Sequence, residues 1–399
     1  MAAGGLSETR LARLHSTLSG HVEAGRLAGA VTLISRRGEV HVDAVGSLAP
    51  GGAEPMRRDS IFRIASLTKP VVAVLTLMLA EECLFSLDEP VARLLPELAS
   101  PRVIAAVDGP LEETVPVELP ITVRDLLTFR NGLGMLFSLP PSSPLGEATA
   151  ALSGFGPPQH AQTETGDEWL ARLAALPLMY QPGSRWLYNT GLEILGVLLS
   201  RAAGTPLPEL LAERVFGPLG MIDTGFTLPA TSVGRLTSAY GVAPSGELVV
   251  DDPAATSKHL VAPTHPSAGA GLLSTIDDFS TFTELLRHFG RRGADRLLSR
   301  PSVEAMLSDQ LTPAQKAVSG FWPGYFDSRG WGFGLAVGTT NNGHDRVGRY
   351  GWDGGSGTTW FTDPAEELTA ILFTQRGGFP MGSPIYLDFW ASVYAAIDD

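Results

Sequence analysis

The sequence predicts an α+β fold, with an antiparallel sheet flanked by helices and a mostly helical inserted domain. Two apolar runs near the start of the chain, 29–35 and 39–45, flank an Arg-Arg-Gly turn and indicate a hairpin. Strand patterns return only late in the chain, and none between about 85 and 225 is strong. If the early and late strands share one sheet, the two ends of the chain form one domain that the helical region interrupts.

The apolar pattern in the first part of the chain predicts a helix, then the hairpin, a short strand and a buried helix. Ser7 can cap a helix that continues to about Glu23, because leucines recur there at spacings of three and four residues. After the hairpin, the short apolar run 61–64 predicts a strand. The long apolar run 69–82 then predicts a buried helix.

The middle of the chain predicts helices separated by loops rich in Pro and Gly, and the last part returns to strands. The predicted middle helices are 90–97, 123–130, 167–175 and 191–203. The predicted late strands and the closing helix are 332–337, 358–362, 368–374 and about 384–397. The expected domains are therefore a discontinuous sheet domain, 1–85 with 265–399, and a mostly helical domain, 86–264.

Composition limits the partners of the protein. The 399 residues include 29 Lys and Arg against 42 Asp and Glu, a net charge of −13, so we expect no binding to nucleic acid. The N-terminus has no basic segment ahead of an apolar one, and the apolar stretch 70–80 is too short to cross a bilayer. We therefore expect a cytoplasmic protein without membrane contact. The eight histidines show no close ligand spacing, and we expect neither a metal nor an organic cofactor.

Ser66 and Lys69 are the candidate nucleophile and general base. Their side chains lie on one face of a helix, because they are three residues apart. A serine hydroxyl becomes a good nucleophile only when a base takes its proton, and apolar neighbours lower the pKa of Lys69 toward that of a base. The helix N-terminus favours negative charge that develops near Ser66. Taken alone, the spacing also fits a capping serine followed by an unrelated lysine.

Further segments follow Ser66 in a fixed order along the chain. They are Asn131-Gly132-Leu133, Tyr188-Asn189-Thr190-Gly191, Gly269-Ala270-Gly271 and Trp352-Asp353-Gly354-Gly355. With S-x-x-K at 66–69, this order resembles the serine β-lactamase and penicillin-binding-protein superfamily, and most of all the class C β-lactamases and family VIII carboxylesterases. The resemblance covers about residues 25 to 395 and implies a β-lactamase/transpeptidase-like fold with the site between its two domains.

The resemblance also implies the roles of individual residues. Tyr188 would be the third catalytic residue, which moves protons provided that Lys69 lowers its pKa. The backbone N–H groups of Ser66 and Gly355 would form the oxyanion hole. The implied substrate-binding residues are Trp352, Asn131, Thr190 and Gly354.

Two positions depart from the β-lactamases that the chain resembles. The third residue of the tyrosine motif is Thr190 in place of Asn, and the sheet-edge motif begins with Trp352 in place of Lys. The second change removes a cation that pairs with a substrate carboxylate and adds an aromatic wall. The sequence therefore predicts a serine hydrolase that cleaves small, uncharged carboxylic esters through an acyl-enzyme on Ser66. The Trp at position 352 resembles the family VIII esterases.

Other functions of the same site stay open. They are β-lactamase, D-amino peptide or amide hydrolase, and acyltransferase; a ligand-binding protein that is acylated without turnover belongs to another class. The chain contains no G-x-S-x-G elbow, so an α/β-hydrolase has no support. The loops at 135–165 and 317–330 are expected to shape the pocket. The partner is expected to be a small-molecule ester, and the sequence indicates neither its identity nor an oligomeric state.

Overall fold

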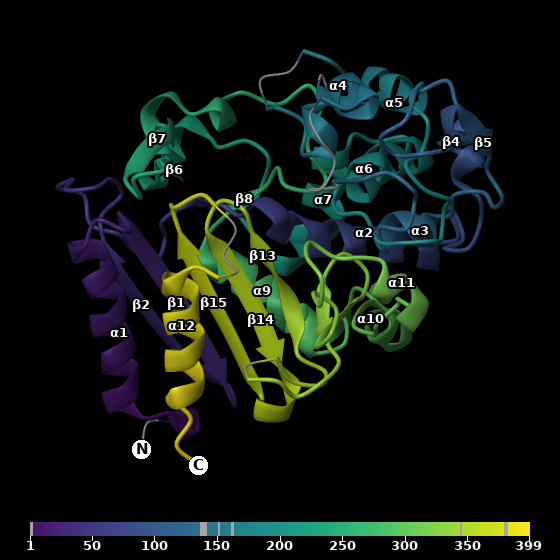
Figure 1. The fold of residues 1–399 in the computed structure, drawn as a ribbon. Coiled ribbons are helices and arrows are strands. Elements are labelled where there is room, and N and C mark those ends of the chain that lie inside the picture. The colour runs from purple at the N-terminus through teal and green to yellow at the C-terminus, as the bar shows by residue number, and fades with distance from the viewer. Residues whose placement is uncertain (1–2, 136–141, 151, 161–162, 344, 379–381) are drawn as a thin grey trace.

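A computed structural model of the chain describes residues 3–135, 142–150, 152–160, 163–343, 345–378 and 382–399 (Figure 1). Its main element is a seven-stranded antiparallel sheet in the order β11-β12-β13-β14-β15-β1-β2. These strands are β1 (Gly29–Arg36), β2 (Glu39–Gly46), β11 (Arg329–Trp331), β12 (Ala336–Gly338), β13 (Tyr350–Gly354), β14 (Thr358–Asp363) and β15 (Leu368–Thr374). Strand β1 pairs with β15, so the early and late strands share one sheet, and the predicted fold class is confirmed.

Helices cover both faces of the sheet, which is why β1 and β15 are buried along their whole length. Helices α1 (Glu8–Glu23) and α12 (Pro384–Ala395) lie side by side on one face, and α9 (Ile276–Arg287) lies behind the other (Figure 1). Side chains alternate between the two faces of a strand. Accordingly, Leu372 joins the core under α1 and α12, while Phe373 joins the core that contains α9.

Helices are the main regular elements of the chain between β2 and β11, and in Figure 1 those from α2 to α7 lie above the sheet, while α9 lies behind it. The helices in this stretch are α2 (Thr68–Glu81), α3 (Val123–Leu127), α4 (Pro144–Ala150), α5 (Gly166–Ala174), α6 (Thr190–Ala203), α7 (Leu207–Leu211), α8 (Gly217–Leu219), α9, α10 (Arg300–Met306) and α11 (Pro313–Ala317). Four short strand pairs accompany them: β3 (Phe62–Arg63) with β8 (Leu273–Ser274), β4 (Arg102–Ile104) with β5 (Thr114–Pro116), β6 (Ala239–Val242) with β7 (Leu248–Asp252), and β9 (Arg291–Arg292) with β10 (Asp295–Arg296). The domain boundaries at 85/86 and 264/265 stay predictions.

The predicted helix at 90–97 is wrong. The chain forms two single 3₁₀ turns there, Val91–Arg93 and Pro96–Leu98. Pro96 has no N–H to donate to an earlier carbonyl and its ring disfavours a helical residue before it, so one continuous helix cannot form. The apolar spacing of this segment reflects packing of the two turns against the core rather than a helical period.

The single strand predicted at 332–337 is also wrong, because the chain turns inside it. Strand β11 ends before this run and β12 begins near its end, with Gly334 at a φ of 73° in the turn between them. That left-handed conformation suits glycine. Among the described residues, no single helix is both long and apolar enough to cross a membrane.

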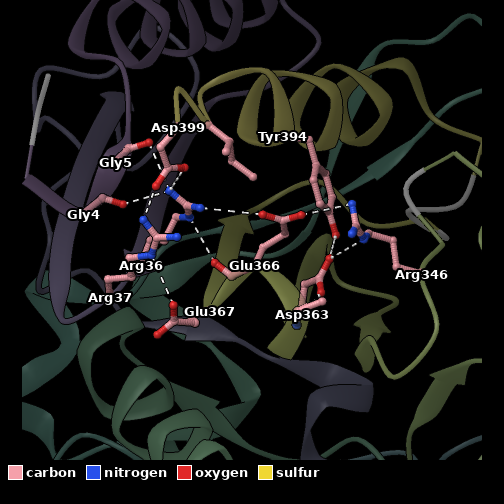
Figure 2. A network of polar contacts seen from close by, with 12 residues as sticks. Gly4, Gly5, Arg36, Arg37, Arg346, Asp363, Glu366, Glu367, Tyr394 and Asp399 are labelled. Atoms are coloured by element: carbon pink, nitrogen blue, oxygen red, sulfur yellow. Dashed lines mark hydrogen bonds and ion pairs between the residues drawn. The ribbon is translucent and has the colours of Figure 1, made fainter.

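Arg36 ties both ends of the chain to the sheet (Figure 2). Its guanidinium is 2% exposed and donates to the carbonyl oxygens of Gly4 (3.0 Å), Gly5 (3.1 Å) and Glu366 (3.0 Å). It also forms an ion pair with the carboxylate of Asp399 at 2.8 Å. The two termini therefore meet at one end of β1, as Figure 1 also shows.

Replacing Arg36 by methionine is expected to lower the free energy of unfolding by about 3 kcal/mol, because several acceptors lose a buried, charged donor at once. Chemical denaturation followed by circular dichroism measures the loss. Arg37→Met is the matched control: its side chain is 45% exposed and forms ion pairs with Glu367 and Asp399 at the surface, so the expected cost is at most about 1 kcal/mol. Equal losses in the two variants would contradict the anchoring role of Arg36.

Candidate active site

Ser66 lies in a single 3₁₀ turn, Ala65–Leu67, that leads directly into α2. Ala65 has a φ of 43°, a left-handed conformation that costs energy in a residue other than glycine and is typical of functional sites. The hairpin β13–β14 supports the turn, because Thr358 Oγ1 donates to the carbonyl oxygen of Ile64 at 3.0 Å. Ser66 is therefore half-buried at the start of α2, with a backbone fixed by its neighbours.

Lys69 is completely buried one turn after Ser66. Its Nζ lies 3.0 Å from Ser66 Oγ and 2.8 Å from the carbonyl oxygen of Gly269. Burial lowers the pKa of Lys69, and the negative charge of nearby Glu193 opposes part of that effect. The structure thus brings the predicted nucleophile and base within hydrogen-bonding distance.

Tyr188 reaches the same point from the segment before α6. Asn189, which follows it, has a φ of 82° and a ψ of −62°, a strained conformation for a residue other than glycine. The ring of Tyr188 lies under the amine of Lys69, with 4.6 Å from Nζ to the ring centroid. Its phenol oxygen accepts a hydrogen bond from Trp352 Nε1 at 2.7 Å and lies close enough to the Ser66 hydroxyl for Ser66 to lower its pKa.

The expectation that Lys69 lowers the pKa of Tyr188 is wrong for the free protein. Burial raises the pKa of Tyr188, and its hydrogen bonds to Ser66 and Trp352 oppose only part of this rise. The amine of Lys69 lies over the ring face rather than beside the phenol oxygen. The phenol is therefore protonated near neutral pH, and Lys69 is the group suited to take a proton from Ser66.

Gly354 and Gly355 belong to the turn between β13 and β14, beside the Ser66 segment. A Cβ atom at Gly354 would lie 2.5 Å from the carbonyl oxygen of Ile64, so this close approach requires glycine. Gly355 is exposed, and its carbonyl accepts the N–H of Gly378 at 2.9 Å, which orients the turn. The oxyanion role of Gly355 and the substrate contact of Gly354 stay predictions.

Three other residues predicted to contact substrate are buried, each at most 1% exposed. Asn131 donates to a backbone carbonyl two residues further on at 3.2 Å. Thr190 donates to the carbonyl oxygen of Phe155 at 3.1 Å, and Trp352 donates to Tyr188. The structure gives all three a role in supporting the site from within, and their direct contact with a substrate stays a prediction.

Aromatic side chains surround Tyr188. Phe321, from the loop predicted to shape the pocket, packs edge-on against it with 5.1 Å between ring centroids. Trp331 packs in the same way against Trp352, at 4.6 Å. The rings in contact with these residues include Phe129, Trp186 and Tyr325. Part of the other predicted pocket loop, at 136–141, 151 and 161–162, lies outside the described residues.

Glu193 is a residue of this site that sequence analysis missed. It lies on α6, is 1% exposed, and its Oε1 accepts a hydrogen bond from Ser267 Oγ at 2.8 Å. Burial raises the pKa of its carboxylate, and Lys69, Ser267 and the backbone N–H groups of Ala268 and Gly269 oppose part of that rise. The available signal was one acidic residue inside the apolar run 192–195, because a charge in such a run needs a partner.

Comparisons with known proteins relate the whole chain to one family. The family model described as Beta-lactamase matches residues 14–392. Protein Rv1367c of Mycobacterium tuberculosis is 37% identical over 362 residues, 89% of this chain and 87% of that protein. Esterase EstB of Burkholderia gladioli is 30% identical over 409 residues, 96% of this chain and 95% of the esterase.

Among solved structures, EstCE1, described as a hydrolase with promiscuous acyltransferase activity, aligns with a TM-score of 0.80 at 27% identity. The alignment covers 97% of this chain and 99% of EstCE1. Within the ranges that the structure describes, no group of three or more His, Cys, Asp or Glu side chains could hold a metal ion.

Proposed function

The chain belongs to the β-lactamase family, and from this premise we propose that it is a serine hydrolase that cleaves small, uncharged carboxylic esters through an acyl-enzyme on Ser66. The observation that supports this most is the contact of Ser66 Oγ with the buried amine of Lys69, at 3.0 Å, with the hydroxyl of Tyr188 near the same serine. Relatives named as esterase or hydrolase support the same chemistry.

Acylation begins when the neutral amine of Lys69 takes the proton of Ser66. Oγ then bonds to the ester carbonyl carbon, and the oxyanion accepts hydrogen bonds from the N–H groups of Ser66 and Gly355. When the tetrahedral intermediate collapses, the bond to the alcohol oxygen breaks. The leaving alkoxide takes a proton from the Tyr188 hydroxyl. The phenolate then recovers a proton from the Lys69 ammonium, after the amine turns from the ring face toward the phenol oxygen, and Ser66 is left acylated.

Deacylation follows the same proton path with water in place of the alcohol. Water loses a proton to Lys69 through the Tyr188 hydroxyl and attacks the acyl carbonyl carbon. The bond to Ser66 Oγ then breaks, Oγ regains a proton, and the carboxylic acid leaves. An alcohol that enters instead of water gives a new ester.

The preference for uncharged esters rests on the aromatic surroundings of the site. Trp352 occupies the position at which the related β-lactamases have a lysine that pairs with a substrate carboxylate. Its indole donates to Tyr188, and the rings of Phe321 and Trp331 pack beside this pair. Such rings favour apolar acyl or alkyl groups and give a carboxylate no charged partner.

Turnover of p-nitrophenyl acetate, butyrate and octanoate beside nitrocefin tests the proposal on the wild-type protein. We expect hydrolysis of the shorter esters and nitrocefin cleavage slower by at least about 100-fold, the effect of a lost charge-assisted contact of nearly 3 kcal/mol. Rapid nitrocefin turnover without ester turnover would overturn the proposal. A stable fluorophosphonate adduct with no ester turnover would instead indicate a protein that is acylated and does not turn over.

Acyl transfer is a second candidate, because EstCE1 is described as having that activity beside hydrolysis. Adding increasing concentrations of an alcohol to the p-nitrophenyl butyrate reaction separates the two functions. In a transferase the new butyrate ester forms at the expense of butyric acid, while p-nitrophenol release continues. In a strict hydrolase butyric acid stays the product at every alcohol concentration.

A further inference from the structure

Lys69 and Glu193 are oppositely charged side chains buried in the same region, and one short piece of backbone joins them. The carboxylate of Glu193 accepts a hydrogen bond from Ser267 Oγ and lies beside the backbone of Ala268 and Gly269, whose N–H groups lower its pKa. The carbonyl of Gly269 in turn accepts a hydrogen bond from Lys69 Nζ at 2.8 Å. Glu193 and Lys69 therefore contact the same short segment, Glu193 through Ser267 and Lys69 through the carbonyl of Gly269.

Any residue larger than glycine at position 269 would have to displace neighbouring side chains. A Cβ atom at Gly269 would lie 2.6 Å from Glu193 Oε1 and 3.0 Å from Asn189 Oδ1. The segment 267–269 is thus pressed against α6 by its contacts with Glu193. Because Lys69 depends on the carbonyl at the end of this segment, the position of its amine relative to Ser66 depends on Glu193.

The electrostatics of the pair point in the same direction. Burial lowers the pKa of Lys69 and raises that of Glu193, while their mutual attraction opposes both effects. Glu193 Oε2 is buried and has no hydrogen-bond donor in the described structure, so Lys69 is what offsets the charge on that oxygen. The other titratable groups are Tyr188, which faces Lys69 with its ring and is protonated, and Asp353, whose charge acts on Tyr188.

We propose that Glu193 is a positioning residue of the esterase reaction, which acts through Lys69 by fixing segment 267–269 and by stabilising the ammonium form of Lys69. This inference rests on the proposed function, in which Lys69 is the base for Ser66. A negative charge near Lys69 raises the pKa of its amine. The amine is then a stronger base, and it becomes neutral only at a higher pH. Glu193 therefore sets the pH at which Ser66 becomes reactive.

The rate at which a fluorophosphonate labels Ser66 between pH 5 and 10, measured by intact mass spectrometry, tests the inference without requiring turnover. Glu193→Gln keeps an oxygen that accepts from Ser267 and removes the charge. Without the anion the ammonium of Lys69 is less stable, its pKa falls, and the neutral amine forms at lower pH. We expect the midpoint of the labelling curve to move by about one pH unit or more toward acid.

Two variants separate charge from shape. Ser267→Ala removes the hydrogen bond that holds segment 267–269 to Glu193 and keeps the charge, so slower labelling with a midpoint like that of the wild type is expected. Glu193→Asp keeps the charge with a shorter reach, and it is also the test to use if the Gln variant does not fold: a wild-type midpoint with slower labelling supports the inference. Glu193→Asp keeps the charge. A shift of its midpoint toward acid as large as the shift expected from loss of the charge would therefore overturn the inference.

Failure of this inference can be distinguished from failure of the proposed function. Wild-type protein that shows no labelling at Ser66 would overturn the proposed function, and this inference with it. If the wild type is labelled at Ser66 and Glu193→Gln has the same labelling midpoint, only the role of Glu193 is overturned.

Discussion

Replacing Ser66 by alanine is expected to lower ester hydrolysis by at least about 1,000-fold, because no other group can form the acyl-enzyme. The variant is also expected to form no fluorophosphonate adduct. Its fold stays intact, since Ser66 is half-buried and Lys69 keeps its hydrogen bond to Gly269. Intact mass spectrometry and p-nitrophenyl butyrate turnover measure the two effects on the same preparation.

The matched control is Ser356→Ala, in the turn that follows Gly355. The Ser356 hydroxyl donates to the backbone carbonyl of Arg63, so it fixes the turn and does not face a base. This variant is expected to keep the adduct and most of its activity. Labelling of the Ser66 variant at the wild-type rate would contradict the central assignment.

The parts of this site that could be predicted are those encoded by local sequence. Ser66 and Lys69 are three residues apart at the start of an apolar helix, a spacing that the resemblance identified as a catalytic pair, and the structure places Ser66 Oγ 3.0 Å from Lys69 Nζ. The sheet could be inferred from a hairpin and from strand patterns at both ends of the chain, because a strand covered on both faces is apolar throughout. Tyr188 needed the resemblance, because one tyrosine beside Trp186 is otherwise indistinguishable from a packing residue.

The parts that could not be predicted depend on contacts between distant segments. Glu193 gains its role from Ser267, which is 74 residues away in the sequence. The direction of the pKa shift of Tyr188 depends on burial by rings from other segments, such as Phe321, so the sequence motif suggested the wrong direction. Trp352 could be recognised as a replacement for lysine, yet its hydrogen bond to Tyr188 is visible only in three dimensions.

Replacing Tyr188 by phenylalanine is expected to slow ester hydrolysis by about 100- to 10,000-fold, the usual contribution of a positioned proton donor and acceptor. The ring keeps its packing against Phe129, at 5.4 Å between centroids, and its place under Lys69. The buried Nε1–H of Trp352 loses its acceptor, which costs about 1 to 3 kcal/mol of stability. Steady-state hydrolysis of p-nitrophenyl butyrate between pH 5.5 and 9.5 measures the effect, with thermal unfolding beside it.

The shape of that pH profile decides which group is the base. Because burial raises the pKa of Tyr188, the phenol is protonated throughout this range. Burial lowers the pKa of Lys69, so the rise in rate with pH is expected to follow the deprotonation of Lys69. The Phe variant should therefore lower the whole curve and leave its midpoint in place. Trp352→Phe removes the donor to the phenol and part of a buried ring but keeps the Tyr188 hydroxyl, so it shows how far the rate falls when the hydroxyl stays and its donor is lost. A Tyr188→Phe curve that loses its rise with pH would instead identify the phenolate as the base, against the geometry of the amine over the ring face.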